Sequence, residues 1–183
     1  MSLSATDLSL SGAKLLTPAI HRDARGWFME SYRRSALQQL GIFAEFVQDN
    51  RSFSTHGVLR GLHFHAPGRE QAKLVRVLSG RVFDVIVDLR PASETFGRWL
   101  SVELNADSAQ LLFVPRGFAH GFQVLSDNAL VSYKVDREYD GAAERSLVWD
   151  APELAIPWPV TPPLLSERDA NAAGWAEAVA ELT

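Results

Sequence analysis

Two short segments place histidines beside glycines and cationic side chains. The first reads Gly57-Val-Leu-Arg60-Gly-Leu-His63-Phe-His65, with Glu70 and Lys73 shortly after it. The second reads Pro115-Arg-Gly117-Phe-Ala-His120-Gly121. Glycine lets a ligand approach the backbone closely, and an imidazole that titrates near neutral pH can both take up and release a proton. These segments therefore predict a site for acid–base chemistry or for ligand binding.

The same histidines also allow two other interpretations. His63 and His65 have the same parity on a strand, so they face one side, and with Glu70 and His120 they match the ligand spacing of metal-binding cupins. Three imidazoles and a carboxylate suit iron, manganese or nickel. Lys73 argues against a metal, because an ammonium group repels a bound cation. The plainest alternative is a structural role, which we favour for His65 taken alone.

The elements that must position these residues are mostly short strands. Residues 74–78 and 81–89 flank Ser79-Gly80, a pattern typical of a two-residue hairpin turn. Within the second run, alternate residues from Phe83 to Leu89 are apolar and should face the core. Four further apolar runs follow: Trp99–Leu104, Leu111–Val114, Gly121–Leu125 and Leu130–Val135. Short helices are expected over Ala36–Leu40, capped by Ser35, and over Gly174–Leu182. The pattern predicts an all-β sandwich or barrel with a few short peripheral helices.

Composition excludes several classes of protein. The 183 residues favour one domain over 1–183, and the absence of cysteine rules out disulfides and thiolate chemistry. A net charge of −4 gives no sign of the basic surface that nucleic acid requires. No apolar stretch approaches the roughly 20 residues of a membrane span, and the first residues lack the pattern of a secretion signal. We expect a cytoplasmic protein with no nucleic-acid or membrane partner.

Longer motifs give the fold and the chemistry a family context. They are Asp23-Ala-Arg25-Gly26-Trp27-Phe28-Met-Glu30-Ser31, Phe46-Val-Gln48-Asp49-Asn50, Val58-Leu-Arg60-Gly-Leu-His63-Phe, Phe83-Asp84-Val85, Asp88, Thr95-Phe96-Gly97, Gly117-Phe-Ala-His120-Gly-Phe, Tyr133-Lys134 and the segment from Trp149 to Pro159. From about Thr17 to about Asp169, in order and at the expected separations, the chain resembles the dTDP-4-dehydrorhamnose 3,5-epimerase family. The resemblance implies a cupin-type jelly-roll β-sandwich.

The resemblance also implies a reaction. Members of this family invert C3 and C5 of dTDP-4-dehydro-6-deoxy-D-glucose and yield dTDP-4-dehydro-L-rhamnose. Both carbons adjoin the C4 ketone, so removal of either proton gives an enolate, and no metal or organic cofactor is needed if the protein stabilises the charge. The resemblance assigns His63 as general base, Tyr133 as the acid on the opposite face, and Lys73 as the cation near the enolate oxygen. From the residues alone, Tyr133 could equally be a core residue and Lys73 a solvated one.

Substrate-binding residues follow from the same resemblance. They are Arg25, Glu30, Gln48, Asn50, Arg60, His120, Tyr139, Glu144 and Arg168. Arginine suits a pyrophosphate because its planar fork binds two oxygens at once. The implied partners are a dTDP-linked 4-keto-6-deoxyhexose and a second copy of the chain. In such a homodimer the N-terminal strands are exchanged, so that Arg25 and Glu30 complete the neighbour's site.

The chain departs from the family pattern at two places. The family usually carries Trp-Asn-Asp-Pro, with an aspartate that pairs with the base histidine, whereas this chain reads Trp149-Asp150-Ala151-Pro152. Asp150 and Asp84 are therefore two open candidates for orienting His63. His65 stands where the family usually has glutamine, which restores the metal spacing. These departures leave open an epimerase that acts at one carbon only, a metal-dependent enzyme, or an inactive sugar-nucleotide binding module.

Overall fold

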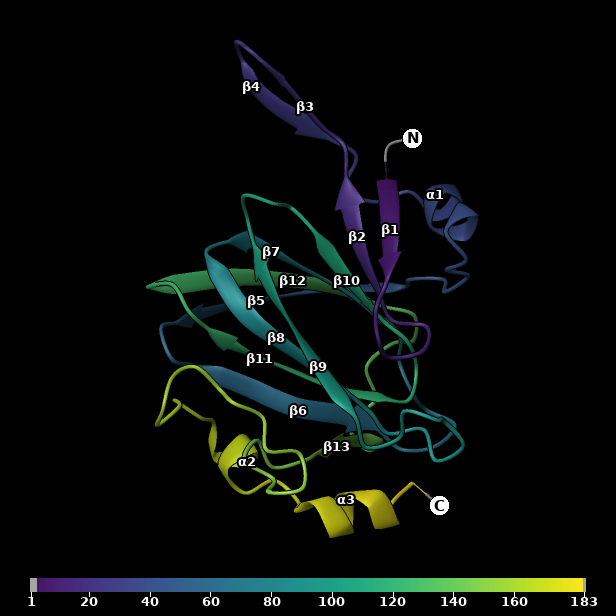
Figure 1. Ribbon diagram of the computed structural model, residues 1–183, viewed down its shortest axis with the longest axis vertical. Coiled ribbons are helices and arrows are strands. Elements are labelled where there is room, and N and C mark those ends of the chain that lie inside the picture. The colour runs from purple at the N-terminus through teal and green to yellow at the C-terminus, as the bar shows by residue number, and fades with distance from the viewer. Residues whose placement is uncertain (1–2, 183) are drawn as a thin grey trace.

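A computed structural model describes residues 3–182, which form two β-sheets that face each other (Figure 1). The six-stranded sheet contains, in spatial order, β1 (Leu3–Asp7), β2 (Lys14–Pro18), β10 (Leu111–Val114), β7 (Lys73–Ser79), β12 (Asn128–Val135) and β5 (Gln48–Thr55). The five-stranded sheet contains β13 (Glu144–Ser146), β6 (Leu59–His65), β11 (Phe118–Val124), β8 (Arg81–Asp88) and β9 (Trp99–Asn105). This architecture confirms the predicted all-β jelly-roll sandwich.

The remaining elements lie at the edges of the sandwich. Within residues 3–182, strands β3 (Ile20–Asp23) and β4 (Gly26–Met29) pair only with each other and form a hairpin that projects from one end of the molecule (Figure 1). Helix α1 (Arg34–Gln39) lies beside β1 and β2, whereas α2 (Glu167–Ala170) and α3 (Trp175–Ala180) lie below the five-stranded sheet. None of the helices within residues 3–182 is long and apolar enough to cross a membrane.

Strand β8 shows why the sheets pack as they do, because both of its faces are buried. Val82 and Ile86 contribute to the core between the two sheets. Val85 and Val87, of the opposite parity, pack against the C-terminal segment that covers the outer face of the five-stranded sheet. Leu89 and the half-buried Phe83 join that second core, which confirms the predicted shared face of residues 83 to 89.

Two local expectations are corrected by the structure. Strands β7 and β8 follow each other but belong to different sheets, so Ser79-Gly80 is a crossing between sheets and not a hairpin turn. Gly80 has a φ of 76°, and a Cβ there would overlap the carbonyl oxygen of Asn128. A hairpin turn and a crossing between sheets both favour a glycine with positive φ, and they differ only in the strands with which β7 and β8 pair. Helix α1 begins at Arg34, so Ser35 lies inside the helix and is not its cap.

Candidate active site

Strands β6 and β11 bring the two histidine segments together. His63 and His120 are register partners, and the register shifts between His120 and Phe122. At this point a Cβ on Gly61 would lie 2.6 Å from the Cα of Gly121, so a side chain would force the two strands apart. Glycine at both positions therefore lets the backbones meet and places the two imidazoles side by side.

His63 forms an ion-pair-type contact with Asp169 from α2. Its Nε2 lies 2.6 Å from Oδ1 of Asp169, and the side chains are 25% and 5% exposed. Burial alone would raise the pKa of Asp169, but hydrogen bonds from His63 and from Ser166 outweigh it, and the net pKa is lowered. The carboxylate thus stays ionised at neutral pH and can hold the ring of His63 in place through Nε2.

The predicted orienters of His63 were wrong. Asp84 is fully buried and accepts from His120, with its two carboxylate oxygens 2.9 and 3.1 Å from Nε2. Asp150 is exposed, and Ala151 is buried in the outer core. The partner is Asp169, which the sequence reasoning treated only as the end of the family resemblance. The pattern Ser166-Glu-Arg-Asp169 is typical of a helix start, because a serine is followed three residues later by an acidic residue, but it does not reveal the contact with His63.

Lys73 and Tyr133 lie on the opposing sheet. Burial lowers the pKa of Lys73 to about 8, and the negative charges of Glu144 and Asp84 partly offset that effect. Burial raises the pKa of Tyr133, so its phenol is protonated at neutral pH. Lys73 also interacts electrostatically with His120 across the sandwich. The site thus has a histidine dyad on one wall and a protonated acid and a cation on the other.

Glu144 organises one side of this site. Its Oε2 accepts hydrogen bonds from the hydroxyl of Tyr139 at 2.8 Å and from Nη1 of Arg168 at 2.6 Å. Burial opposes ionisation of Glu144, but these two hydrogen bonds outweigh it and its net pKa is lowered. The nearby charges of His63 and Lys73 also act on this carboxylate. Glu144 therefore links Tyr139 and Arg168 to the cluster around His63 and Lys73.

Strand β5 supplies a polar lining. Gln48 accepts from the backbone N–H of Tyr139 at 2.8 Å and donates to Oδ1 of Asn50 at 2.8 Å. Asn50 is the register partner of Tyr133 on β12. Arg60, whose charge acts on Tyr133, donates from Nε to the hydroxyl of Ser54 at 3.0 Å. The fold thus gathers the predicted binding residues of the two sheets around His63 and Tyr133.

Two further predicted binding residues, Arg25 and Glu30, lie in and just after the projecting hairpin. Arg25 lies in the projecting hairpin, where its side chain is 91% exposed and pairs with Asp23 (Figure 1). Glu30 pairs with Arg33 just after the hairpin, with Nε 2.9 Å from Oε2. The hydrogen bonds that Arg25 forms with Asp23 stay within the hairpin.

The arrangement of side chains does not fit the metal-dependent alternative. His63 is bonded to Asp169 and His120 to Asp84, whereas Glu70 lines a separate cavity of about 260 Å³ together with His65 and Leu182. Across residues 3–182 no group of three or more histidines and carboxylates converges as a metal site would require. Burial lowers the pKa of His65, with the charge of Lys73 adding to the effect, and the same positive charge would repel a cation at this imidazole.

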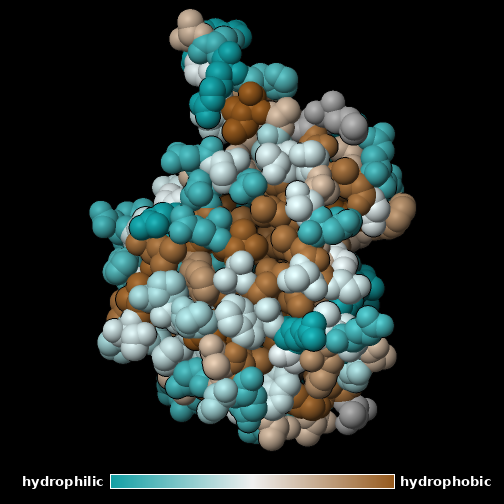
Figure 2. Space-filling model, in the orientation of Figure 1, coloured by the Kyte–Doolittle hydropathy of each residue, from teal (hydrophilic) through white to brown (hydrophobic). Residues whose placement is uncertain are grey.

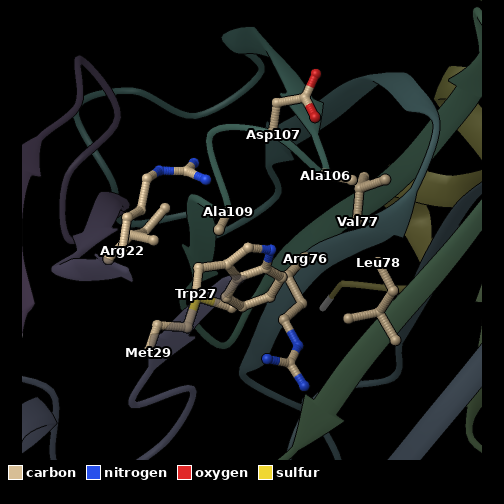
Figure 3. A pocket seen from close by; sticks show the side chains of 10 residues that line it. Arg22, Trp27, Met29, Arg76, Val77, Leu78, Ala106, Asp107 and Ala109 are labelled. Carbon is tan, nitrogen blue, oxygen red and sulfur yellow. The ribbon is translucent and has the colours of Figure 1, made fainter. Parts of the chain in front are cut away.

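A second cavity, of about 230 Å³, lies at the base of the hairpin. Figure 3 shows the indole ring of Trp27 in its middle, beside Met29 and the guanidinium group of Arg76. Arg22 and Asp107 stand at its margin. None of the residues that line it belongs to the His63–Tyr133 cluster, so the acid–base site is defined by that polar cluster and not by this cavity.

Comparison with known proteins identifies relatives over nearly the whole chain. The family model described as dTDP-4-dehydrorhamnose 3,5-epimerase matches residues 7–177. A relative of that name from Methanothermobacter thermautotrophicus is 45% identical over 166 residues, which cover 89% of each chain. Among solved structures, the Bacillus anthracis dTDP-4-dehydrorhamnose 3,5-epimerase with TDP and PPi bound has a TM-score of 0.92 and 44% identity over 94% of this chain and 99% of that one.

A third similar protein was solved with a sugar nucleotide in place. It is the dTDP-6-deoxy-D-glucose-3,5-epimerase of Legionella pneumophila in complex with dTDP-4-keto-L-rhamnose, with a TM-score of 0.89 and 43% identity over 93% of this chain and 91% of that one. The match of the family model to nearly the whole chain, the level of identity and the shared architecture lead to one conclusion. The chain belongs to the dTDP-4-dehydrorhamnose 3,5-epimerase family.

Proposed function

We propose that this chain inverts C3 and C5 of dTDP-4-dehydro-6-deoxy-D-glucose to give dTDP-4-dehydro-L-rhamnose. The observation that carries the proposal is the placement of base and acid on opposite walls. The His63–Asp169 dyad belongs to the five-stranded sheet and its covering helix, whereas Tyr133 belongs to the six-stranded sheet. A sugar ring held between the sheets would lose a proton from one face and receive a proton on the other, which inverts the carbon.

The proposed inversion consists of proton transfers only, so it needs no reactant besides the sugar and water. His63 takes the proton from a carbon next to the C4 ketone, and the electron pair moves onto the C4 oxygen to form an enolate. The ammonium group of Lys73 stabilises that developing charge in a dry environment, where electrostatic stabilisation is strongest. As the enolate collapses, Tyr133 gives its proton to the opposite face of the same carbon. Exchange of both groups with solvent protons then resets them for the second carbon.

The polar residues around the dyad would hold the nucleotide sugar. Arg60 and Arg168 supply cationic forks suited to the diphosphate, in keeping with the TDP and PPi bound to the similar Bacillus anthracis protein. Gln48, Asn50 and His120 would bond to the sugar or the base. Tyr139 is 59% exposed and tied to Glu144, so it would line the outer part of the site.

Arg25 and Glu30 require a second subunit in this proposal. An isolated two-stranded hairpin is at best marginally stable in water, yet β3 and β4 pair only with each other. Their Trp27 and Phe28 side chains are 60% and 70% exposed, an amount of apolar surface that another copy of the chain would cover. In a homodimer with exchanged hairpins, Arg25 and Glu30 would reach the partner's site.

The test is proton exchange in deuterated water. Purified protein is mixed with dTDP-4-dehydro-6-deoxy-D-glucose, and deuterium at C3 and C5 is followed by NMR. We expect exchange at both carbons, loss of both in His63→Asn, and loss of epimerised product in Tyr133→Phe. Asp150→Asn is the matched control, because Asp150 is exposed and outside the site, and it should behave as wild type.

The other outcomes separate the alternatives. Exchange at a single carbon would show an epimerase that inverts only C3 or only C5 through the same His63–Asp169 dyad. Tight binding of dTDP without exchange at either carbon would contradict the proposal and indicate a binding module.

A further inference from the structure

Ser166 makes two hydrogen bonds to the same residue. As the residue that precedes α2, it accepts from the backbone N–H of Asp169 at 3.1 Å. Its hydroxyl also lies 2.8 Å from Oδ2 of Asp169, to which it donates. The other carboxylate oxygen, Oδ1, is the one that contacts His63. A continuous chain of hydrogen bonds therefore runs from Ser166 through Asp169 to His63.

Because Asp169 is buried, the hydrogen bond from the Ser166 hydroxyl to its Oδ2 controls how the carboxylate is oriented. The side chain is 5% exposed, so water has little access to either carboxylate oxygen. A buried carboxylate oxygen needs a donor, and the donor fixes the rotation of the carboxylate about its last bond. With Oδ2 held by Ser166, Oδ1 is directed at Nε2 of His63. We propose that Ser166 is a positioning residue of the active site, which sets the orientation of the base through Asp169.

The hydrogen-bond pattern goes beyond that of an ordinary helix cap. A cap needs only an oxygen that accepts from the backbone, and the donated hydroxyl proton is not part of that role. Helix α2 is also anchored independently, because Arg168 bonds to Glu144 and to the hydroxyl of Ser146 on β13. The inference rests on the proposed function, since it assumes that His63 is the base whose orientation matters.

Three substitutions separate positioning from capping. Ser166→Gly removes the hydroxyl but keeps most of the capping stability, since glycine is among the residues favoured at a helix N-cap. Ser166→Ala removes the hydroxyl and the capping stability, and Ser166→Thr keeps the hydroxyl and the capping stability. We expect kcat to fall roughly 10- to 100-fold in the Gly and Ala variants, as for loss of a hydrogen bond to a charged group, and to recover in the Thr variant. KM should change little, because Ser166 does not line the site.

Two further measurements keep the outcome decisive. The proton shared by His63 and Asp169 should give a downfield NMR signal in wild type and Ser166→Thr, and that signal should move or vanish in Ser166→Gly. This NMR signal is measured without substrate, so it tests the role of Ser166 independently of turnover. If the wild-type protein exchanges no proton of the sugar, that result contradicts the proposed function and leaves the test of Ser166 intact. In an Asp169→Asn background, Ser166→Gly should add little further loss of kcat, because both changes act on one unit.

Other results would overturn the inference. If Ser166→Gly keeps the wild-type kcat and the wild-type imidazole signal, the hydroxyl serves only as a cap. If the Gly variant loses kcat, dTDP affinity and thermal stability together, or if its loss adds fully to that of Asp169→Asn, Ser166 supports the fold and not the base.

Discussion

Lys73 presents a conflict between stability and chemistry at a single residue. Its side chain is buried at the start of β7, and burial lowers its pKa to about 8. At neutral pH it still carries its proton, so the fold holds a charged group where an apolar one would be more stable. Such a cost is typical of a group kept for its action on a substrate, and here the ammonium would face the enolate oxygen.

Replacing Lys73 by methionine should therefore separate the two effects. We expect kcat to fall at least about 100-fold, as for loss of a preorganised charge that stabilises an oxyanion. We expect the free energy of unfolding at pH 7 to rise by about 1–3 kcal/mol, because a side chain of similar length no longer carries a buried charge. Steady-state kinetics and urea denaturation measure the two quantities.

The pH dependence gives the sign of each effect in the wild type. Because the folded pKa of about 8 lies below the ordinary 10.5, the unfolded chain binds the Lys73 proton more tightly, and stability should rise between pH 8 and 10.5. Over the same rise kcat should fall as the ammonium loses its charge. Lys73→Met should lose both pH-dependent changes. Lys14→Met, at a lysine paired with the exposed Asp7, keeps Lys73 and should retain the wild-type kcat and both pH-dependent changes. A Lys73→Met protein that keeps wild-type kcat would contradict the assigned role.

The residues proposed for catalysis can be picked out in the sequence more readily than the contacts between them. His63 and His120 stand in motifs with glycines whose spacing fits the close approach of β6 and β11. Asp169 could not be found in this way, because it lies 106 residues from His63 and reaches it only through the fold of the C-terminal segment. Reasoning from neighbouring carboxylates led to Asp84 and Asp150, since sequence shows which carboxylates exist but not which one folds onto the base.

Among the elements, the connection from β8 to β9 is held by one carboxylate. Asp88 is fully buried and accepts from the backbone and side chain of Arg90 and from the hydroxyls of Ser93 and Thr95, the last two at 2.6 Å. Burial opposes its ionisation, but these hydrogen bonds outweigh it and lower the pKa of Asp88 to about 2. Arg90 also stacks over Phe118 at 4.5 Å, so the loop is tied to the core.

We expect Asp88→Asn to destabilise the protein by about 2 kcal/mol at pH 7. A carboxylate with a lowered folded pKa contributes its full stability above its ordinary value near 4 and loses it as the pH falls toward 2. The difference in unfolding free energy between wild type and Asp88→Asn should therefore narrow from pH 4 downward. Urea denaturation at pH 7, 4 and 3 measures it. Glu94→Gln, an exposed acidic residue in the same loop, is the control, and an equal effect of both substitutions would refute the assignment.

Strand positions could be predicted more reliably than strand partners. The run Leu111–Val114 was predicted with both observed ends, and the run Leu130–Val135 with its observed C-terminal end, because alternation and turn residues are local signals. The pairing of β7 with β10 and β12, and of β8 with β9 and β11, depends on contacts far apart in sequence. A glycine with positive φ between two strands is compatible with a hairpin and with a crossing, so Gly80 alone could not distinguish them.

The whole molecule is asymmetric, with one compact sandwich and one extended hairpin. Figure 2 shows apolar residues gathered in the middle of the visible face, below the mostly polar hairpin. On the hairpin itself Trp27 and Phe28 remain largely exposed, and Trp27 borders the cavity of Figure 3. A surface of this kind is expected at a contact with another chain. A homodimer with exchanged hairpins would cover this apolar surface. It would also bring Arg25 of one subunit to the active site of the other.

Mixing two inactive variants tests that exchange directly. Arg25→Ala removes a residue of the hairpin, and His63→Asn removes the base of the sandwich, so each protein alone should be nearly inactive at low substrate concentration. In a hybrid dimer with exchanged hairpins, the Arg25→Ala subunit has an intact base and receives Arg25 from its partner, so one of the two sites is complete. After random reassortment of subunits from an equal mixture, about one quarter of all sites should be active.

The controls of the mixing experiment decide between dimer models. Phe28→Asp should place a charge in the apolar contact, give monomers in sedimentation experiments and abolish the recovery of activity. If activity does not recover although hybrid dimers form, Arg25 acts within its own chain or not at all, and the exchanged arrangement is wrong. If wild-type protein sediments as a monomer and still binds dTDP tightly, the site is complete without a partner, and the exposure of Trp27 and Phe28 needs a different explanation.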